Sequence, residues 1–533
     1  MSIKINNISL SIEDEIEILK EKAANKLNIS KENIIKFNIL RQSLDARKKD
    51  NIKYNYSLEV FTDKDEIIVK NIIDKDVYIY NVPKMEKIIF GDKKLLHRPV
   101  VVGFGPAGMF AALELARNGY NPLVIERGEA IEKRTETVNN FWQKGVLNPE
   151  SNVQFGEGGA GTFSDGKLTT RIKDTRCDKV LEQFVKCGAP EEVIYSGKPH
   201  IGTDILKIVV KNIREEVIRL GGEILFNHKL EDINFENNKI KSIVVNKMEI
   251  PCEVLVMAIG HSSRDTYEML HKNNIFMESK PFAIGVRIEH SQKLINLSQF
   301  GKFAEHPKLK AADYRLTHTC KNSGRAVYSF CMCPGGSVVA AASEQNMLVT
   351  NGMSDYKRDK ENGNSAIVVS VNNNDFTGNS PLSGMEFQRH YEKLAYTVGG
   401  GNYTAPIQLT QDFINNSVTK KLGNIEPTYK PGYKFSDLRQ CLPNYVSEAL
   451  TEGLLVFNKK IKNFSDNNSI LTGIETRTSA PLRIMRNEKL QSINVEGIYP
   501  SGEGAGFAGG IISAAVDGIK SAESIMKEYI SYY

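Results

Sequence analysis

A glycine-rich turn between an apolar run and a helical pattern constrains this chain more than any other feature. Residues 103–108 read GxGxxG, directly after the apolar run 99–102, and apolar residues then recur at helical spacing over 109–116. In this strand–turn–helix setting the first glycine allows a tight turn, the second admits a pyrophosphate, and the third lets helix and strand pack closely. The helix N-terminus supplies N–H groups for the anion. The residues predicted to bind a dinucleotide are Gly103, Gly105, Pro106, Ala107 and Gly108.

The acid that follows the next apolar run supports the same interpretation. Glu126 directly follows the run 122–125. Its carboxylate can accept hydrogen bonds from both ribose hydroxyls, whereas a 2′-phosphate there would meet a negative charge. The motif therefore favours a dinucleotide without that phosphate. Two nearby cations, Arg127 and Arg134, are predicted to reach the adenosine or its phosphates.

Two further segments favour FAD over NAD. Residues 155–168 carry many glycines and small polar side chains, as a backbone approached closely by a ligand requires. A flexible surface loop is the alternative. Residues 495–512 contain a strand pattern, a carboxylate and a glycine-led helix. The candidate ligand-binding residues of the two segments are Gly158, Gly159, Gly161, Thr162, Ser164, Gly166, Lys167, Gly502, Glu503, Gly509, Gly510 and Ile511.

With these segments the chain resembles the flavoproteins with two dinucleotide-binding domains, in the branch that contains fumarate reductase. The resemblance implies that Glu503 binds the ribityl chain of FAD, and that the helix entered at 509–512 points its N-terminus at the flavin. It implies that the strand segment 221–230, ending at Leu230, lies beside the adenine. It also implies that the apolar segment ending at Gly260 closes the cofactor domain.

The chain is more closely similar to an uncharacterised bacterial and plastid group described as FAD-dependent oxidoreductases or NAD(FAD)-utilizing dehydrogenases. Segments 156–168, 260–265 and 330–336 carry this likeness, which extends over nearly the whole chain. It implies FAD, and we expect the cofactor to be bound non-covalently because no residue pattern identifies an attachment site. No second GxGxxG has a strand–turn–helix context, so NAD(P)H is expected at most as an electron donor without its own domain.

Three side chains are predicted to take part in catalysis. Cys331 and Cys333 face the same way if their segment is extended, and a dithiol beside a flavin could relay two electrons. Two small buried hydrophobic residues before a Pro-Gly-Gly turn are the alternative. His261 follows the strand that ends at Gly260 and could exchange protons near neutral pH.

Composition limits the remaining possibilities. The chain has 533 residues, which suggests two to four domains, and a formal net charge of +5, which requires neither a nucleic-acid nor a membrane partner. The longest apolar run is far too short to span a bilayer, and the first residues are polar where a signal peptide is apolar. We therefore expect a cytoplasmic protein. The spacing of the seven cysteines predicts no metal site.

The predicted fold class is α/β. We expect a ferredoxin-like α+β domain at 1–92, a Rossmann-like FAD-binding domain formed by 96–265 and 435–533, and an inserted α+β substrate or cap domain at 266–434. The expected function is FAD-dependent oxidation or reduction of an unidentified small molecule by hydride transfer at flavin N5. Flavin-dependent RNA modification, weakly favoured by the basic segment 47–53, and a non-catalytic redox sensor or scaffold are the alternatives.

Overall fold

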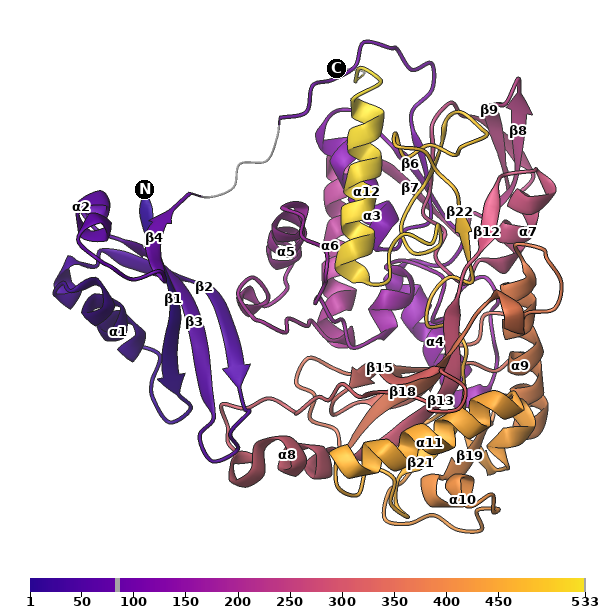
Figure 1. The fold of residues 1–533 in the computed structure, drawn as a ribbon. Coiled ribbons are helices and arrows are strands. Elements are labelled where there is room, and N and C mark those ends of the chain that lie inside the picture. Colours follow the sequence, from indigo (N-terminus) through magenta and orange to yellow (C-terminus); the bar gives the residue numbers. More distant parts are fainter. Residues whose placement is uncertain (82–86, 532–533) are drawn as a thin grey trace.

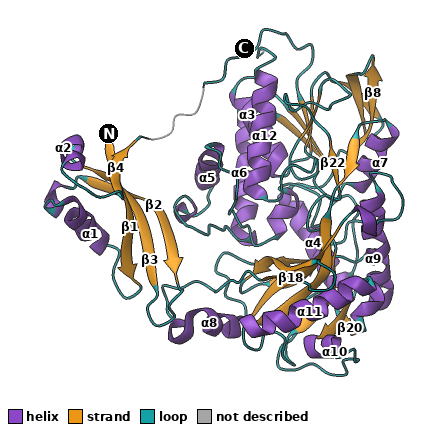
Figure 2. Cartoon of the chain, in the orientation of Figure 1, coloured by secondary structure: helices purple, strands orange, loops and turns teal. Residues whose placement is uncertain are grey.

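The N-terminal domain is an antiparallel sheet with two helices. The computed structural model describes residues 1–81 and 87–531. The strands and α-helices of this domain are β1 (Ser2–Ser11), α1 (Ile18–Leu27), β2 (Lys36–Asp45), β3 (Lys53–Phe61), α2 (Asp65–Lys70) and β4 (Val77–Tyr80). The sheet order is β2-β3-β1-β4, which is the βαββαβ connectivity of ferredoxin-like domains. Figure 2 shows this sheet away from the other sheets of the chain.

One end of the N-terminal domain nevertheless packs against the rest of the molecule. Ile12 and Ile52 belong to the hydrophobic cluster of the middle of the chain. Gln42 exchanges two backbone hydrogen bonds of 2.7 Å, donating to Tyr195 and accepting from Gly197. A Cβ on Gly301 would lie 3.2 Å from the Cβ of Lys49, which stands in the basic segment. One side of that segment therefore faces the chain's own middle domain.

A five-stranded parallel sheet forms the core of the domain that contains the GxGxxG turn. Its strands, in the order β23-β11-β5-β6-β7, are β23 (Ile498–Pro500), β11 (Leu255–Met257), β5 (Val100–Val102), β6 (Leu123–Glu126) and β7 (Glu223–Phe226). The first four are buried along their whole length, as expected of apolar strands in a parallel sheet covered on both faces. The prediction of an α/β fold with a Rossmann-like parallel sheet is confirmed.

Helices pack on this sheet directly or through neighbouring elements. They are α3 (Pro106–Arg117), α4 (Ile131–Lys144), α5 (Arg176–Lys186), α6 (Thr203–Arg219), α7 (Arg264–Lys272) and α12 (Ile511–Met526). α3 and α12 lie side by side (Figure 1). A Cβ on Gly518 would lie 2.0 Å from the carbonyl oxygen of Ala107, so this close helix contact requires glycine. An antiparallel sheet is added by β8 (Leu230–Glu236), β9 (Lys239–Val245) and β10 (Met248–Pro251).

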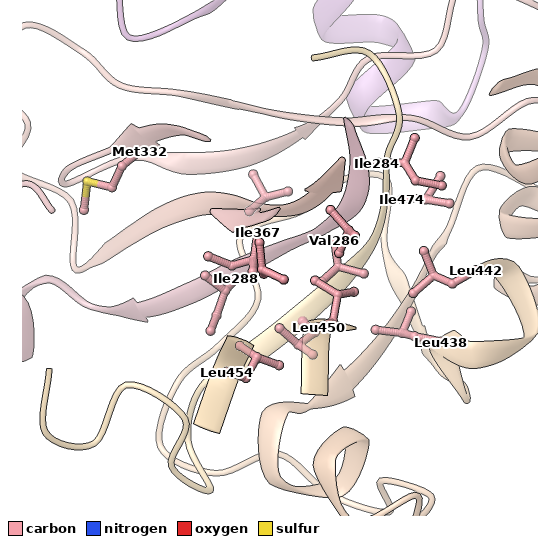
Figure 3. Packing of buried hydrophobic residues seen from close by; sticks show 14 of the residues in the cluster. Ile284, Val286, Ile288, Met332, Ile367, Leu438, Leu442, Leu450, Leu454 and Ile474 are labelled. Atoms are coloured by element: carbon pink, nitrogen blue, oxygen red, sulfur yellow. The ribbon is translucent and has the colours of Figure 1, made fainter. Parts of the chain in front are cut away.

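The middle domain is built on a seven-stranded sheet. In the order of the sheet, its strands are β14 (Thr317–Thr319), β15 (Ala326–Cys333), β18 (Asn362–Val371), β13 (Phe282–Ser291), β21 (Ile470–Glu475), β19 (Ala405–Leu409) and β20 (Tyr433–Phe435). Its helices are α8 (Gln292–Phe300), α9 (Ser383–Gly399), α10 (Thr410–Ile414) and α11 (Asn444–Lys460). Leu450 and Leu454 of α11 share one hydrophobic cluster with Val286 and Ile288 of β13 (Figure 3).

Short elements complete the chain between these sheets. Two antiparallel pairs are β12 (Met277–Ser279) with β22 (Leu482–Ile484) and β16 (Ser337–Ala340) with β17 (Thr350–Met353). The 3-10 helices are η1 (Lys31–Asn33), η2 (Gly159–Phe163), η3 (Glu191–Val193), η4 (Gly301–Phe303), η5 (Asn373–Asp375) and η6 (Leu438–Cys441).

The boundary predicted at 434/435 is wrong. Residues 435–478 contain α11 and β21, and β21 pairs with β13 and β19 inside the seven-stranded sheet. The chain returns to the parallel sheet only with β23 and α12. The error has a physical reason: β21 is a buried apolar run, and such a run fits a central strand of either sheet.

Candidate functional site

A cavity of about 410 Å³ lies between the parallel sheet and the middle domain. It is lined by the turn after β5, the glycine-rich segment 156–168 and the segment that leads into α12. The predicted site residues that line it are Gly103, Gly105, Pro106, Ala107, Glu126, Arg127, Gly159, Gly161, Ser164, Gly166, Lys167, Leu230, Gly260, His261, Cys331, Glu503, Gly509, Gly510 and Ile511. Segments far apart in the sequence thus meet around one space.

The GxGxxG turn has the geometry that its spacing predicts. Gly103 has a φ of +94°, and its N–H donates to the carbonyl of Ile125 at 2.8 Å, which fixes the tight turn. A Cβ on Gly108 would lie 1.8 Å from the carbonyl oxygen of Gly103, so the third glycine permits the packing of α3 on β5. Gly105 is different: a Cβ there would approach only Gly159, at 3.7 Å. Protein packing therefore does not require glycine at 105, whereas a ligand in the cavity would.

Other glycines around the cavity also have open space where a Cβ would lie. A Cβ on Gly260 or Gly509 would meet no protein atom within 4 Å, and one on Gly510 would reach only the Oγ of Ser513, at 4.0 Å. Gly105 and Gly510 stand immediately before α3 and α12, whose first N–H groups have no partner within their own helices. Bare backbone and two helix N-termini fit a ligand that carries phosphates.

The carboxylate of Glu126 accepts hydrogen bonds from the backbone around the first turn. One carboxylate oxygen accepts from the N–H of Phe104 at 2.8 Å. The other accepts from Gly128 at 2.8 Å and Gly156 at 3.0 Å. The carboxylate lines the cavity, as expected of a ribose ligand, and it also holds the glycine-rich segment against the turn. Arg127 lines the cavity too, with its guanidinium 4.2 Å from the centre of the Phe155 ring.

Arg134 does not reach the cavity, which corrects its predicted role. The side chain is fully buried and donates to the carbonyls of Asn152, Val153, Glu157 and Gly159, at 2.9 Å for the first two and 3.0 Å for the last. Burial lowers the pKa of the guanidinium to about 10. The physical reason is that a glycine-rich segment leaves buried carbonyls that need donors. Arg134 supplies these donors from behind the segment.

Five other predicted residues also lie behind the cavity wall. They are Gly108, Gly158, Thr162, Cys333 and Gly502. A Cβ on Gly158 would lie 1.9 Å from the Oγ1 of Thr162, so this glycine makes room for the protein's own side chain. The N–H of Gly502 donates to Asp517 at 2.7 Å. A glycine-rich motif mixes glycines needed for packing with glycines needed for a ligand, and the sequence does not separate them.

The site also contains a half-buried acid, Glu503, and a half-buried imidazole, His261. Burial raises the pKa of Glu503 to about 7, although Lys280 opposes the shift. Burial, helped by the guanidiniums of Arg477 and Arg264, lowers the pKa of His261 to about 3. The imidazole is therefore neutral near pH 7, which contradicts the prediction that it exchanges protons there. Its Nδ1 lies 3.0 Å from the Oγ of Ser262.

Besides Cys331, the middle domain contributes side chains that the sequence motifs did not predict as a group. Asn351, Glu475 and Thr478 line the cavity together with Arg477. Glu475 is paired through both oxygens, at 3.0 Å each, with the fully buried Arg287. These residues come from β17, β21 and the turn after it, and no local spacing links them. The available signal was a charged residue, Glu475, at the end of an apolar run.

A second cluster lies elsewhere in the middle domain. Ligand atoms of His318, Cys320 and Glu452 lie within 4.8 Å of one another, an arrangement that could hold a metal ion. The Nε2 of His318 is 2.7 Å from the Oε1 of Glu452, and this contact accounts for the pair without an ion. Cysteine spacing gave no sign of the cluster because Glu452 comes from a distant helix. Among the described residues, no helix is both long and apolar enough to cross a membrane.

The fold and the cavity define a dinucleotide-binding protein of the Rossmann type. Residues 281–478 match the family model described as "FAD-dependent protein, C-terminal domain-like", and residues 2–61 match a domain of unknown function. The chain belongs to the same family as an uncharacterised protein of Clostridium beijerinckii, to which it is 60% identical over 529 residues, 99% of each chain. The FAD-dependent match supports FAD as the cofactor and an oxidoreductase-like flavoprotein.

Solved structures share the general type of fold only weakly. A glycine oxidase from Geobacillus kaustophilus is 9% identical, with a TM-score of 0.35 over 80% of this chain and 94% of its own. A quinol fumarate reductase FrdA variant from E. coli is 10% identical, with a TM-score of 0.36 over 81% of this chain and 70% of its own. Likenesses this weak carry no argument about function.

Proposed function

We propose that this chain binds FAD non-covalently and oxidises or reduces a small molecule by hydride transfer at flavin N5. The observation that supports this most is the single cavity lined by the GxGxxG turn, the glycine-rich segment and the entry to α12. The glycines at 105 and 509 strengthen the proposal, because neither protein packing nor a left-handed backbone explains them, whereas Gly260 has a φ of +72°. The family match of residues 281–478 points to the same cofactor.

The chain's own residues would bind and orient this cofactor. The N-termini of α3 and α12 offer N–H groups to negative charge at two places in the cavity. Glu126 and Glu503 both line the cavity, where Glu126 would hold ribose hydroxyls and Glu503 a hydroxyl of the ribityl chain. Bound FAD would supply acceptance and release of hydride. The side chains around Cys331 and Glu475 would form the wall against which a substrate lies.

Two alanine substitutions in one motif test the proposal. Gly105→Ala should leave stability nearly unchanged, since its Cβ makes only an ordinary contact and the residue has a φ of −81°. It should weaken FAD binding at least about tenfold, because the methyl group stands where the pyrophosphate approaches. The measurement is titration of the purified, cofactor-free protein with FAD, followed by calorimetry and by the visible absorbance of the bound flavin.

Gly108→Ala is the matched control. Its Cβ collides with the carbonyl oxygen of Gly103, so it should lower the free energy of unfolding by about 2 kcal/mol, in the range found for overpacked positions. A wild-type preparation that is colourless and does not bind added FAD would refute the proposal. Equal FAD affinity of the wild type and Gly105→Ala would show that the first turn does not hold the cofactor.

A further inference from the structure

The segment 331–333 places two cysteines at the edge of the cavity, one on it and one directly behind it. Cys331 is half-buried and lines the cavity, whereas Cys333 is fully buried. Met332 between them packs into the hydrophobic cluster of the middle domain (Figure 3). The two thiols therefore belong to the wall of the site, and the intervening side chain anchors the segment to the core.

An irregularity in β15 creates this arrangement. Phe330 pairs with Ala366 of β18 and Cys333 pairs with Asn364, so β15 holds one residue more than β18 over this stretch. Cys331 has a φ of +44°, which is unusual for a residue other than glycine. Such bulges redirect side chains and are frequent beside active sites. Here the bulge turns the backbone of Cys331 so that its carbonyl accepts from the Sγ of Cys333 at 3.4 Å.

Two cations stand beside the pair. The ammonium of Lys167, which also lines the cavity, donates to the carbonyl of Met332 and is 2.6 Å from Asp165. The guanidinium of Arg287 donates to the carbonyl of Cys331 at 3.3 Å. The pKa of the Cys331 thiol is lowered, chiefly by the adjacent Cys333 thiol and then, against burial, by Lys167 and Arg287. Thiolates in such surroundings are the reactive ones.

We propose that Cys331 and Cys333 form a redox-active dithiol/disulfide pair that exchanges two electrons with the flavin. This inference rests on the proposed function, because it needs FAD in the cavity. In the forward step the two thiols lose two protons and two electrons, one Sγ–Sγ bond forms, and oxidised FAD is reduced to FADH₂. The reverse step breaks the Sγ–Sγ bond and returns both thiols. Neither direction needs a further oxidant or reductant.

Reductive titration counts the electrons that the pair would store. Holoprotein is oxidised with diamide, desalted and titrated with dithionite without oxygen, while the flavin absorbance is followed. The wild type should take up about four electrons per flavin, and Cys331→Ser and Cys333→Ser about two, because a disulfide is a two-electron couple. Cys177→Ser, a half-buried cysteine on α5 outside the cavity, should still take up about four.

A second measurement uses the unaltered chain, in case Cys333→Ser does not fold. Trypsin should release residues 326–357 as one peptide, whose only cysteines are 331 and 333. After diamide this peptide should resist alkylation and regain two reactive thiols on reduction. FAD-loaded protein that takes up only about two electrons and keeps both thiols alkylatable would overturn the inference and leave the proposed function standing. Protein that binds no FAD would instead refute the proposed function.

Discussion

The two walls of the cavity are built in different ways. The wall of the Rossmann-type domain is mostly bare backbone, from the turn at 103–108 and the segment 156–168, and its shape depends on glycine. The wall of the middle domain consists of side chains, among them Cys331, Asn351 and Glu475, which come from three separate strands. Backbone walls suit a ligand that is always the same, whereas side-chain walls can vary with the substrate.

The walls also differ in what holds them in place. Arg134 supports the backbone wall through hydrogen bonds to carbonyls. Carboxylates support the side-chain wall: Glu475 is paired with Arg287, and Glu392 with Arg264 and Arg477. Removing each support should therefore damage one wall more than the other, and the following substitutions test that difference.

Arg134→Met is expected to have the largest effect. It leaves four buried carbonyls without their donor, and each unsatisfied group costs roughly 1–3 kcal/mol before the structure relaxes. We expect the free energy of unfolding, measured with urea, to fall by about 4 kcal/mol, with loss of FAD binding. The exposed Arg219→Met is the control and should change stability by less than about 0.5 kcal/mol. A similarly small effect of Arg134→Met would show that the glycine-rich segment keeps its conformation without these hydrogen bonds.

Glu392→Gln should have the next largest effect. The fully buried carboxylate of Glu392, on α9, lies 2.6 Å from a guanidinium nitrogen of Arg264 and 2.8 Å from one of Arg477. Loss of its charge leaves two buried cations with less compensation, which should lower the free energy of unfolding by about 3 kcal/mol.

Glu392→Gln should also change the side-chain wall of the cavity. Arg477 lines the cavity and is paired with Glu392, so loss of this carboxylate should disturb the side-chain wall. Glu386→Gln, on the same helix and exposed, is the control and should leave stability within about 0.5 kcal/mol of the wild type. If Glu392→Gln changes the free energy of unfolding as little as Glu386→Gln does, the ion pairs of Glu392 do not support the side-chain wall.

The backbone wall could be predicted from the sequence, whereas of the side-chain wall only Cys331 was predicted to take part in catalysis. The first depends on local spacing: the glycines at 103 and 105 and the acid at 126 fall at distances that a strand, a turn and a helix impose. Asn351 and Glu475 lie on strands that the sequence shows only as apolar runs, and which strands become neighbours is decided by the order of the seven-stranded sheet.

The incorrect predictions within the motifs have one common cause. Gly158 and Arg134 belong to the right segments but serve the packing of the protein instead of facing the cavity. Spacing identifies a segment that approaches a ligand, yet the direction of each side chain depends on contacts with residues distant in the sequence. The boundary error at 435 has the same origin, since β21 is assigned to its sheet only by pairing with β13.

The smallest expected effect is the contribution of the Glu503 carboxyl to the pH dependence of stability. Its pKa in the folded chain is raised from 4.5 to about 7 by burial, so folding favours the protonated form. Stability should therefore be lost as pH rises from about 4.5 to about 7. In cofactor-free protein, Glu503→Gln should gain stability relative to the wild type over this range, on the order of 2 kcal/mol, in urea unfolding at each pH. A difference between Glu503→Gln and the wild type that stays constant over this pH range would place the Glu503 carboxyl in contact with water.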